Sequence, residues 1–133
     1  GEGVEQPVAE LVRAKGFEAR TILTSFVHER VHRTKQLLPE VRAGILLNSV
    51  PVKLLSVAHD AFADNIHLEH RKVTRETVDR IHDAGKTIAA WGLIRGDEQF
   101  DRLFELGVDM IGSDWPTELL RRRDSYFSQR LGV

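Results

Sequence analysis

Short runs of β-branched and other apolar residues alternate along the chain with longer stretches in which apolar residues recur at helical spacing. The runs that predict buried strands are residues 21–26, 43–47, 65–68, 87–93 and 108–111. The amphipathic stretches around them predict helices. Strands that alternate with helical segments of about 10–15 residues are typical of βαβ units and of a parallel sheet.

Local signals place several helix ends. Val8, Leu11 and Val12 have the spacing of one buried helix face. Asp97 is expected to cap the start of a later helix, because Asp is favoured at that position. Pro116 is expected in the first turn of the last helix, where proline is well tolerated.

The predicted fold class is α/β, with about five strands of a (β/α)₈ TIM-type barrel. A closed barrel of this type usually needs about 250 residues, and the chain has 133. A small open doubly wound sheet is the alternative architecture. Because no linker or low-complexity segment interrupts the pattern, we expect a single unit over residues 1–133.

Composition narrows the function classes. Hydrophobic residues make up 41% of the chain and charged residues 29%, which is typical of a globular protein. A net charge of −1 gives no field that favours nucleic acid, and no apolar run is long enough to cross a bilayer. The chain has no Cys, which leaves the redox compartment open. No signal peptide is visible, so we expect a cytoplasmic protein. Its first residue is Gly1 rather than Met, so we expect a processed end or a fragment.

In either architecture, functional residues gather beyond the C-terminal ends of the strands. The residues expected there are Phe26, Asn48, residues 67–70, Trp91 and Asp114. An aromatic residue at two of these ends indicates an apolar wall for a small ligand. The alternative is that Phe26 and Trp91 only fill the mouth of the barrel.

Several segments resemble the glycerophosphodiester phosphodiesterase family. Residues 24–26 are similar to its "SSF" segment and residues 44–47 to its "GLLL" strand. Residues 66–70 resemble its "INLHY" strand, and Ala90-Trp91 stands where the family has "VWTVN". Residues 106–116 are similar to its "LGVDGIITDYP" ending. The pieces occur in the family's order and identify the chain as the C-terminal half of such a barrel.

The resemblance implies a metal-dependent phosphodiesterase that cleaves glycerophosphodiesters to glycerol 3-phosphate and an alcohol. It also implies a divalent cation, Ca²⁺ or Mg²⁺, held by carboxylates on early strands, and two His residues that act as acid and base. The family's "HRG", "E-x-D" and "E-I-K" motifs are absent here, and both His-Asp pairs fall in predicted helices. We therefore assign no catalytic residue and no metal ligand to this chain.

The resemblance transfers only a substrate wall, namely Phe26, Trp91 and His67. The alternative for His67 is a structural role on a buried strand. Gly92 and Ile94 stand where the family has Thr and Asn, so polar contacts to the substrate are lost there.

Two other segments contain residues that could bind a metal ion. His28-Glu29-Arg30-Val31-His32 matches the H-E-x-x-H zinc protease motif, whose two His share one helix face. It lacks an evident third ligand, and a solvated helix face is the simpler interpretation. His67, Glu69 and His70 could also bind a metal, but His70 points to the other side of a strand from the first two. A charged strand end is the simpler interpretation there.

Two functions remain open from the sequence. The chain could complete a phosphodiesterase barrel, with a missing N-terminal half as its partner and a glycerophosphodiester as the substrate of the whole. It could instead be a non-catalytic half-barrel that pairs with a second copy of itself, since an open half-barrel leaves unpaired strand edges. A zinc protease is the distant third.

Overall fold

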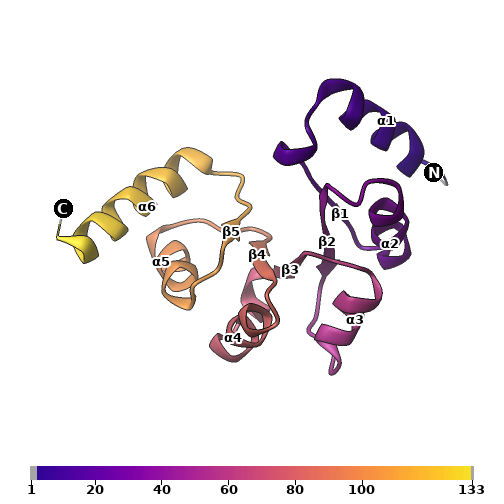
Figure 1. Cartoon of the computed structure of the whole chain (residues 1–133). Coiled ribbons are helices and arrows are strands. Elements are labelled where there is room, and N and C mark those ends of the chain that lie inside the picture. Colours follow the sequence, from indigo (N-terminus) through magenta and orange to yellow (C-terminus); the bar gives the residue numbers. More distant parts are fainter. Residues whose placement is uncertain (1–2, 133) are drawn as a thin grey trace. The chain divides into compact units, whose positions relative to one another are not determined.

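The computed structural model describes residues 3–132, in which helices and strands alternate (Figure 1). The helices are α1 (Glu5–Lys15), α2 (His28–Leu37), α3 (Leu54–Asp60), α4 (Arg75–Asp83), α5 (Asp97–Leu106) and α6 (Pro116–Leu131). The strands are β1 (Ile22–Ser25), β2 (Arg42–Leu47), β3 (Asn65–Glu69), β4 (Thr87–Trp91) and β5 (Met110–Ile111). Short 3₁₀ turns cover Glu18–Arg20 and His70–Lys72.

The strand order in the sheet follows the chain order from β1 to β5. β1 pairs in parallel with β2, with Ile22 opposite Arg42. β4 pairs in parallel with β5, with Ala89 opposite Met110. A doubly wound sheet reverses its strand order at a switch point, whereas a barrel keeps it sequential. The predicted TIM-type α/β class is therefore confirmed, and the doubly wound alternative does not fit.

Some predicted details were wrong. Leu11 lies on α1 but is 59% exposed, and the buried face of that helix is formed by Ala9 and Val12. Gly96 rather than Asp97 holds the N-cap position of α5, and Asp97 is the first helical residue. The strand predicted over residues 87–93 ends at Trp91, because Gly92 has a φ of 121° that turns the chain out of the sheet.

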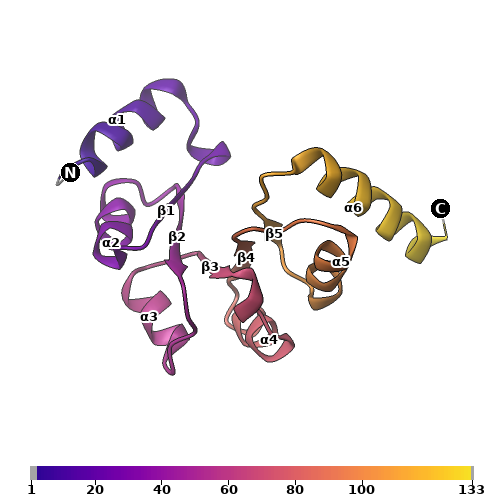
Figure 2. The same cartoon turned by 180° about the vertical axis from the view of Figure 1, so that it is seen from behind.

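The described residues fall into two compact units, one ending at His67 and the other starting at Leu68. In the first unit, α2 packs against β1 and β2 as well as against α1 (Figure 2). A core cluster joins Ala9 and Val12 of α1 to Leu38 and Val41, the two residues that flank the turn before β2. Burial of these side chains holds the first helices on the strands.

In the second unit, α4 packs on β4 and α5 packs on α6. Ile81, Ile88, Phe100 and Leu103 are fully buried there. Their burial accounts for the helical periodicity read in α4 and α5, because the apolar stripe of each helix faces the interior.

A carboxylate ties two strands together in the first unit. Asp64 directly precedes β3, and its Oδ2 accepts a hydrogen bond from the Ala43 N–H of β2 at 2.9 Å. The same oxygen lies 2.9 Å from Lys35 Nζ of α2. In return, the Asp64 N–H donates to the Ala43 carbonyl at 2.8 Å. Asp64 thus fixes where β2 and β3 begin.

The second unit repeats this arrangement with Asp109. Asp109 Oδ2 accepts from the Ile88 N–H of β4 at 2.8 Å and lies 2.8 Å from His82 Nε2 of α4. The Asp109 N–H donates to the Ile88 carbonyl at 3.0 Å. Both carboxylates lie at the N-terminal ends of their strands, the face that serves stability in barrels of this type.

We expect Asp109→Asn to lower the free energy of unfolding by about 1–2 kcal/mol, because the hydrogen bond from the Ile88 N–H and the contact with His82 lose the negative charge of their acceptor. Urea unfolding followed by circular dichroism measures the loss. Asp83→Asn removes an exposed carboxylate close to the same helix end and is the matched control. Equal losses in the two variants would contradict this role of Asp109.

Candidate substrate-binding site

Phe26 follows the C-terminal end of β1, as predicted. The turn that begins there is held by Ser25, whose Oγ accepts a hydrogen bond from the Val27 N–H at 3.0 Å. The Phe26 side chain is 52% exposed. A large aromatic ring that stays half exposed at a strand end is available to contact a ligand.

His67 lies on β3, and its imidazole covers Gly44 of the neighbouring strand. A Cβ built on Gly44 would stand only 2.7 Å from both Cδ2 and Nε2 of His67. Any larger residue at position 44 would therefore collide with the ring. Burial lowers the pKa of His67 below its usual value of 6.5, so the ring is neutral at pH 7.

Glu69 ends β3 and organises the turn that follows. Its carboxylate accepts from the Arg71 backbone N–H at 3.2 Å and from Arg71 Nε at 2.9 Å. His70 Nε2 lies 3.5 Å from Glu69 Oε1. Arg102 of α5 donates to the backbone carbonyls of His70 and Val73 at 3.1 and 2.6 Å. These contacts give Glu69 and His70 a structural role in the turn.

Trp91 is the last residue of β4, at the predicted strand end, and is partly buried. The next residue must be small, because a Cβ on Gly92 would lie 3.2 Å from His70 Cδ2 and 3.3 Å from Glu69 Oε1. Ile94 is fully buried, and its carbonyl accepts from Ser113 Oγ at 2.8 Å. The two departures from the family pattern therefore serve packing in this unit.

Phe26 and His67 belong to the first compact unit and Trp91 to the second. Each stands at or near the strand end predicted for it. That the three share one substrate wall stays a prediction. Asn48 follows β2 directly, and Asp114 follows β5 by three residues.

The H-E-x-x-H segment does form a helix, α2, with both His residues beside one shallow cavity. His28 Nε2 lies 3.4 Å from the Leu46 carbonyl, and the His32 ring packs 4.6 Å from the ring of Phe62. Glu29 pairs with Arg33 at 2.8 Å. Within residues 3–132, no three His, Asp or Glu side chains are grouped so that they could hold a metal ion. The structure thus gives the zinc interpretation no third ligand.

The same finding bears on the cation that the resemblance implies. Neither the β3 end nor the two His-Asp pairs supplies a ligand group in the described part of the chain. His59 and His82 lie on α3 and α4, as predicted for helical segments. The described residues therefore do not fit a divalent cation, and we assign none of them as a metal ligand.

Sequence reasoning missed Asp64, Asp109 and Arg102, which hold the strand starts and the turn after β3. A signal existed for the first two, since each Asp stands directly before a strand, in Asp64-Asn65-Ile66 and Asp109-Met110-Ile111. Nothing local marks Arg102, because its carbonyl partners are about thirty residues away.

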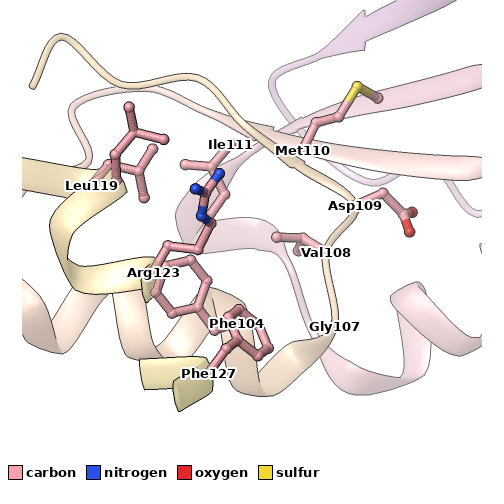
Figure 3. A pocket seen from close by; sticks show the side chains of 10 residues that line it. Phe104, Gly107, Val108, Asp109, Met110, Ile111, Leu119, Arg123 and Phe127 are labelled. Atoms are coloured by element: carbon pink, nitrogen blue, oxygen red, sulfur yellow. The ribbon is translucent and has the colours of Figure 1, made fainter. Parts of the chain in front are cut away.

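A cavity of about 470 Å³ lies beside β5 (Figure 3). Its lining includes Phe104 of α5, Ile111 of β5, and Leu119, Arg123 and Phe127 of α6. It also includes the segment 107–109 before β5, so it lies away from the strand end where a substrate is expected. We therefore do not assign it to the substrate.

Gly44→Ala is expected to lower the free energy of unfolding by about 1–3 kcal/mol, through overpacking against His67. In a His67→Ala background the same substitution should cost less than half as much, because the ring has gone. Gly112→Ala, whose new Cβ would meet its nearest neighbour at 3.8 Å, is the control. A double-mutant cycle by urea unfolding measures the coupling. Equal costs in both backgrounds would show that the ring does not set this constraint.

Stability should fall as the pH drops below about 6.5. Burial lowers the pKa values of His67 and His70 in the folded chain, so the unfolded chain binds protons first. Urea midpoints between pH 7.5 and 5.5 test this. His67→Gln should flatten the dependence, whereas substitution of His59, with its 82% exposed side chain, should not. A midpoint independent of pH would contradict the burial argument.

Comparison with known proteins gives a consistent result. The model of the glycerophosphoryl diester phosphodiesterase family matches residues 4–118. A glycerophosphodiester phosphodiesterase from Caldanaerobacter subterraneus subsp. tengcongensis is 26% identical over 118 residues, which are 89% of this chain and 48% of that protein. The enzyme of the same name from Bacillus altitudinis is 25% identical over 126 residues, covering 92% of this chain and 50% of its own length.

Solved structures agree. A Galdieria sulphuraria protein named for the same activity superposes with a TM-score of 0.84 at 25% identity, over 91% of this chain and 50% of that one. An Oleispira antarctica phosphodiesterase was solved in complex with the product sn-glycerol-3-phosphate. It shares the fold, with a TM-score of 0.76 at 19% identity, and the match covers 93% of this chain and 52% of the Oleispira chain. This chain spans about half the length of the relatives it matches. It belongs to the glycerophosphoryl diester phosphodiesterase family.

Proposed function

We propose that this chain is the scaffold and substrate-wall half of a metal-dependent barrel that hydrolyses glycerophosphodiesters to glycerol 3-phosphate and an alcohol. The observation that carries the proposal is the family match over residues 4–118. Because the chain spans about half of its relatives, the activity belongs to the whole barrel, and both compact units contribute to one half of it.

The catalytic groups and the Ca²⁺ or Mg²⁺ ion are assigned to the rest of the barrel. Two observations support this division. The described residues include no group of three metal-ligating side chains. Glu69, the carboxylate at the end of β3, is already engaged by Arg71 and close to His70. Removing it from that turn to bind a cation would break the contacts that shape the strand end.

This chain contributes the wall. Phe26 and Trp91 follow or end their strands, where an aromatic face can exclude water from the substrate. His67 is neutral at pH 7, because burial lowers its pKa, and a neutral imidazole can donate or accept one hydrogen bond. It is suited to a glycerol hydroxyl rather than to the phosphate charge. We also propose that the whole barrel acts in the cytoplasm and that its substrates are diesters derived from lipids.

Within residues 3–132, no helix is both long and apolar enough to cross a membrane.

Co-expression with the part of the Caldanaerobacter relative that this chain does not match tests the proposal. The assembled pair should release glycerol 3-phosphate from glycerophosphocholine with Mg²⁺ or Ca²⁺, and EDTA should stop it. Trp91→Ala in the pair should raise KM about tenfold, a loss of about 1.4 kcal/mol of binding. An active pair in which Trp91→Ala leaves KM unchanged would contradict the proposal that Trp91 forms part of the substrate wall.

Leu11→Ala is the control for that variant. It removes another apolar side chain, but from the exposed side of α1. It should leave KM unchanged. A pair that assembles, as judged by co-purification, yet shows no metal-dependent turnover would contradict the proposed function as a whole.

A further inference from the structure

A cavity of about 250 Å³ lies between the turn after β3 and the helix α5. It is lined by His70 and Arg71 of the turn and by Gln99 and Arg102 of the helix. All four residues belong to the second compact unit. They follow β3 and β4, which have a neighbour on each side in the strand order, so the cavity does not depend on an end of the sheet.

Arg102 is a firmly anchored donor of this cavity. Its Nη1 and Nη2 donate to the carbonyls of His70 and Val73 at 3.1 and 2.6 Å. These two hydrogen bonds hold the guanidinium in place and leave its Nε–H for another acceptor. Among residues 3–132, no carboxylate forms an ion pair with Arg102, so its positive charge is not neutralised.

The other two donors are also held through atoms that a ligand would not use. Gln99 Oε1 accepts a hydrogen bond from the Arg95 N–H at 3.0 Å, which leaves the amide NH₂ group to donate. Arg71 Nε donates to Glu69 at 2.9 Å, which leaves the two Nη groups. Donors that are positioned before a ligand arrives lose less conformational entropy when it binds.

The charge around the cavity is positive. Within the described part of the chain, no carboxylate belongs to the lining, although Glu69 balances Arg71 from outside it. Burial lowers the pKa of His70, Glu69 opposes this shift, and the positive charges of Arg71 and Arg102 add to it. Both guanidinium groups therefore act on the same small volume, and the charge of Arg102 is left over.

A phosphate group matches this combination of charge and donors. Guanidinium groups bind phosphate oxygens through charge-assisted hydrogen bonds. Donors on three separate side chains suit a tetrahedral group with at least three oxygens, whereas a carboxylate offers only two. A cation would be repelled by Arg102, and an apolar group would leave the donors without acceptors.

We propose that this cavity binds an anion of the phosphate class, with Arg71, Gln99 and Arg102 as its donors. Inorganic phosphate and a phosphate monoester both present the tetrahedral group that these donors suit. The cavity lies wholly within the second unit and the inference concerns binding alone, so it does not depend on the proposed function. Because the Arg71 side chain is 78% exposed, binding is weak and is screened by salt.

Titration of the isotope-labelled 133-residue chain with sodium phosphate tests the site by NMR. Sodium chloride holds the ionic strength constant, so that general screening does not move the signals. Saturating shifts are expected for the backbone amides of residues 70–73 and 99–102. A second titration uses sn-glycerol 3-phosphate, and the tighter of the two ligands identifies whether the cavity takes the free ion or a monoester.

Gln99→Glu keeps the acceptor for the Arg95 N–H but replaces the donor group with a carboxylate oxygen. It should weaken phosphate binding roughly tenfold or more, because like charges then face each other. Gln6→Glu makes the same change at an exposed position of α1 and should bind like the wild type. Arg71→Gln should also weaken binding, whereas Lys72→Gln removes the same charge from a neighbour that does not line the cavity.

The amide spectrum of each variant shows whether it is folded, and Arg71→Gln provides the test should Gln99→Glu unfold. A wild type whose amides show no saturating shift with either anion overturns the inference, whether or not an assembled barrel is active. So does a Gln99→Glu variant that binds phosphate as tightly as Gln6→Glu.

Discussion

The starts of the strands are fixed by two carboxylates, one in each compact unit. Asp64 and Asp109 each accept a backbone N–H from the strand before them, and each returns a backbone N–H to that same strand. A parallel pair needs a fixed register, since a slip of one residue would turn every side chain to the other face. In the first unit this register places His67 over Gly44. In the second it places Ala89 opposite Met110 and Ala90 opposite Ile111.

This anchoring at one end of the strands leaves the other end free for function. Barrels of this type separate the two tasks in the same way, with stability at the N-terminal face and chemistry at the C-terminal face. Among residues 3–132, the C-terminal strand ends carry aromatic and imidazole groups, and no three potential metal ligands are grouped there. Glu69, the carboxylate nearest to such a role, is held by Arg71 in the turn after β3. The division suits a half that shapes a pocket while the reacting groups come from elsewhere.

Much of the fold could be predicted from the sequence, because apolar periodicity records burial directly. The strand at residues 43–47 and the start of the last helix at Pro116 follow from such local signals. Leu11 was misassigned, because hydrophobicity alone cannot say which side of α1 faces the core. Long-range contacts were also missed: the Arg102 contacts join residues about thirty positions apart. The roles of Gly92 and Ile94 depend on what packs against them, which no local pattern reveals.

The most direct test of the central claim is the hydrolysis of glycerophosphocholine by the purified 133-residue chain alone, with Mg²⁺ or Ca²⁺ and an EDTA control. The account predicts no release of glycerol 3-phosphate above the EDTA background, because this chain holds the wall and not the reacting groups. Metal-dependent turnover would contradict it. Such turnover would mean that His67, Glu69 and His70 rearrange to form a catalytic site of their own.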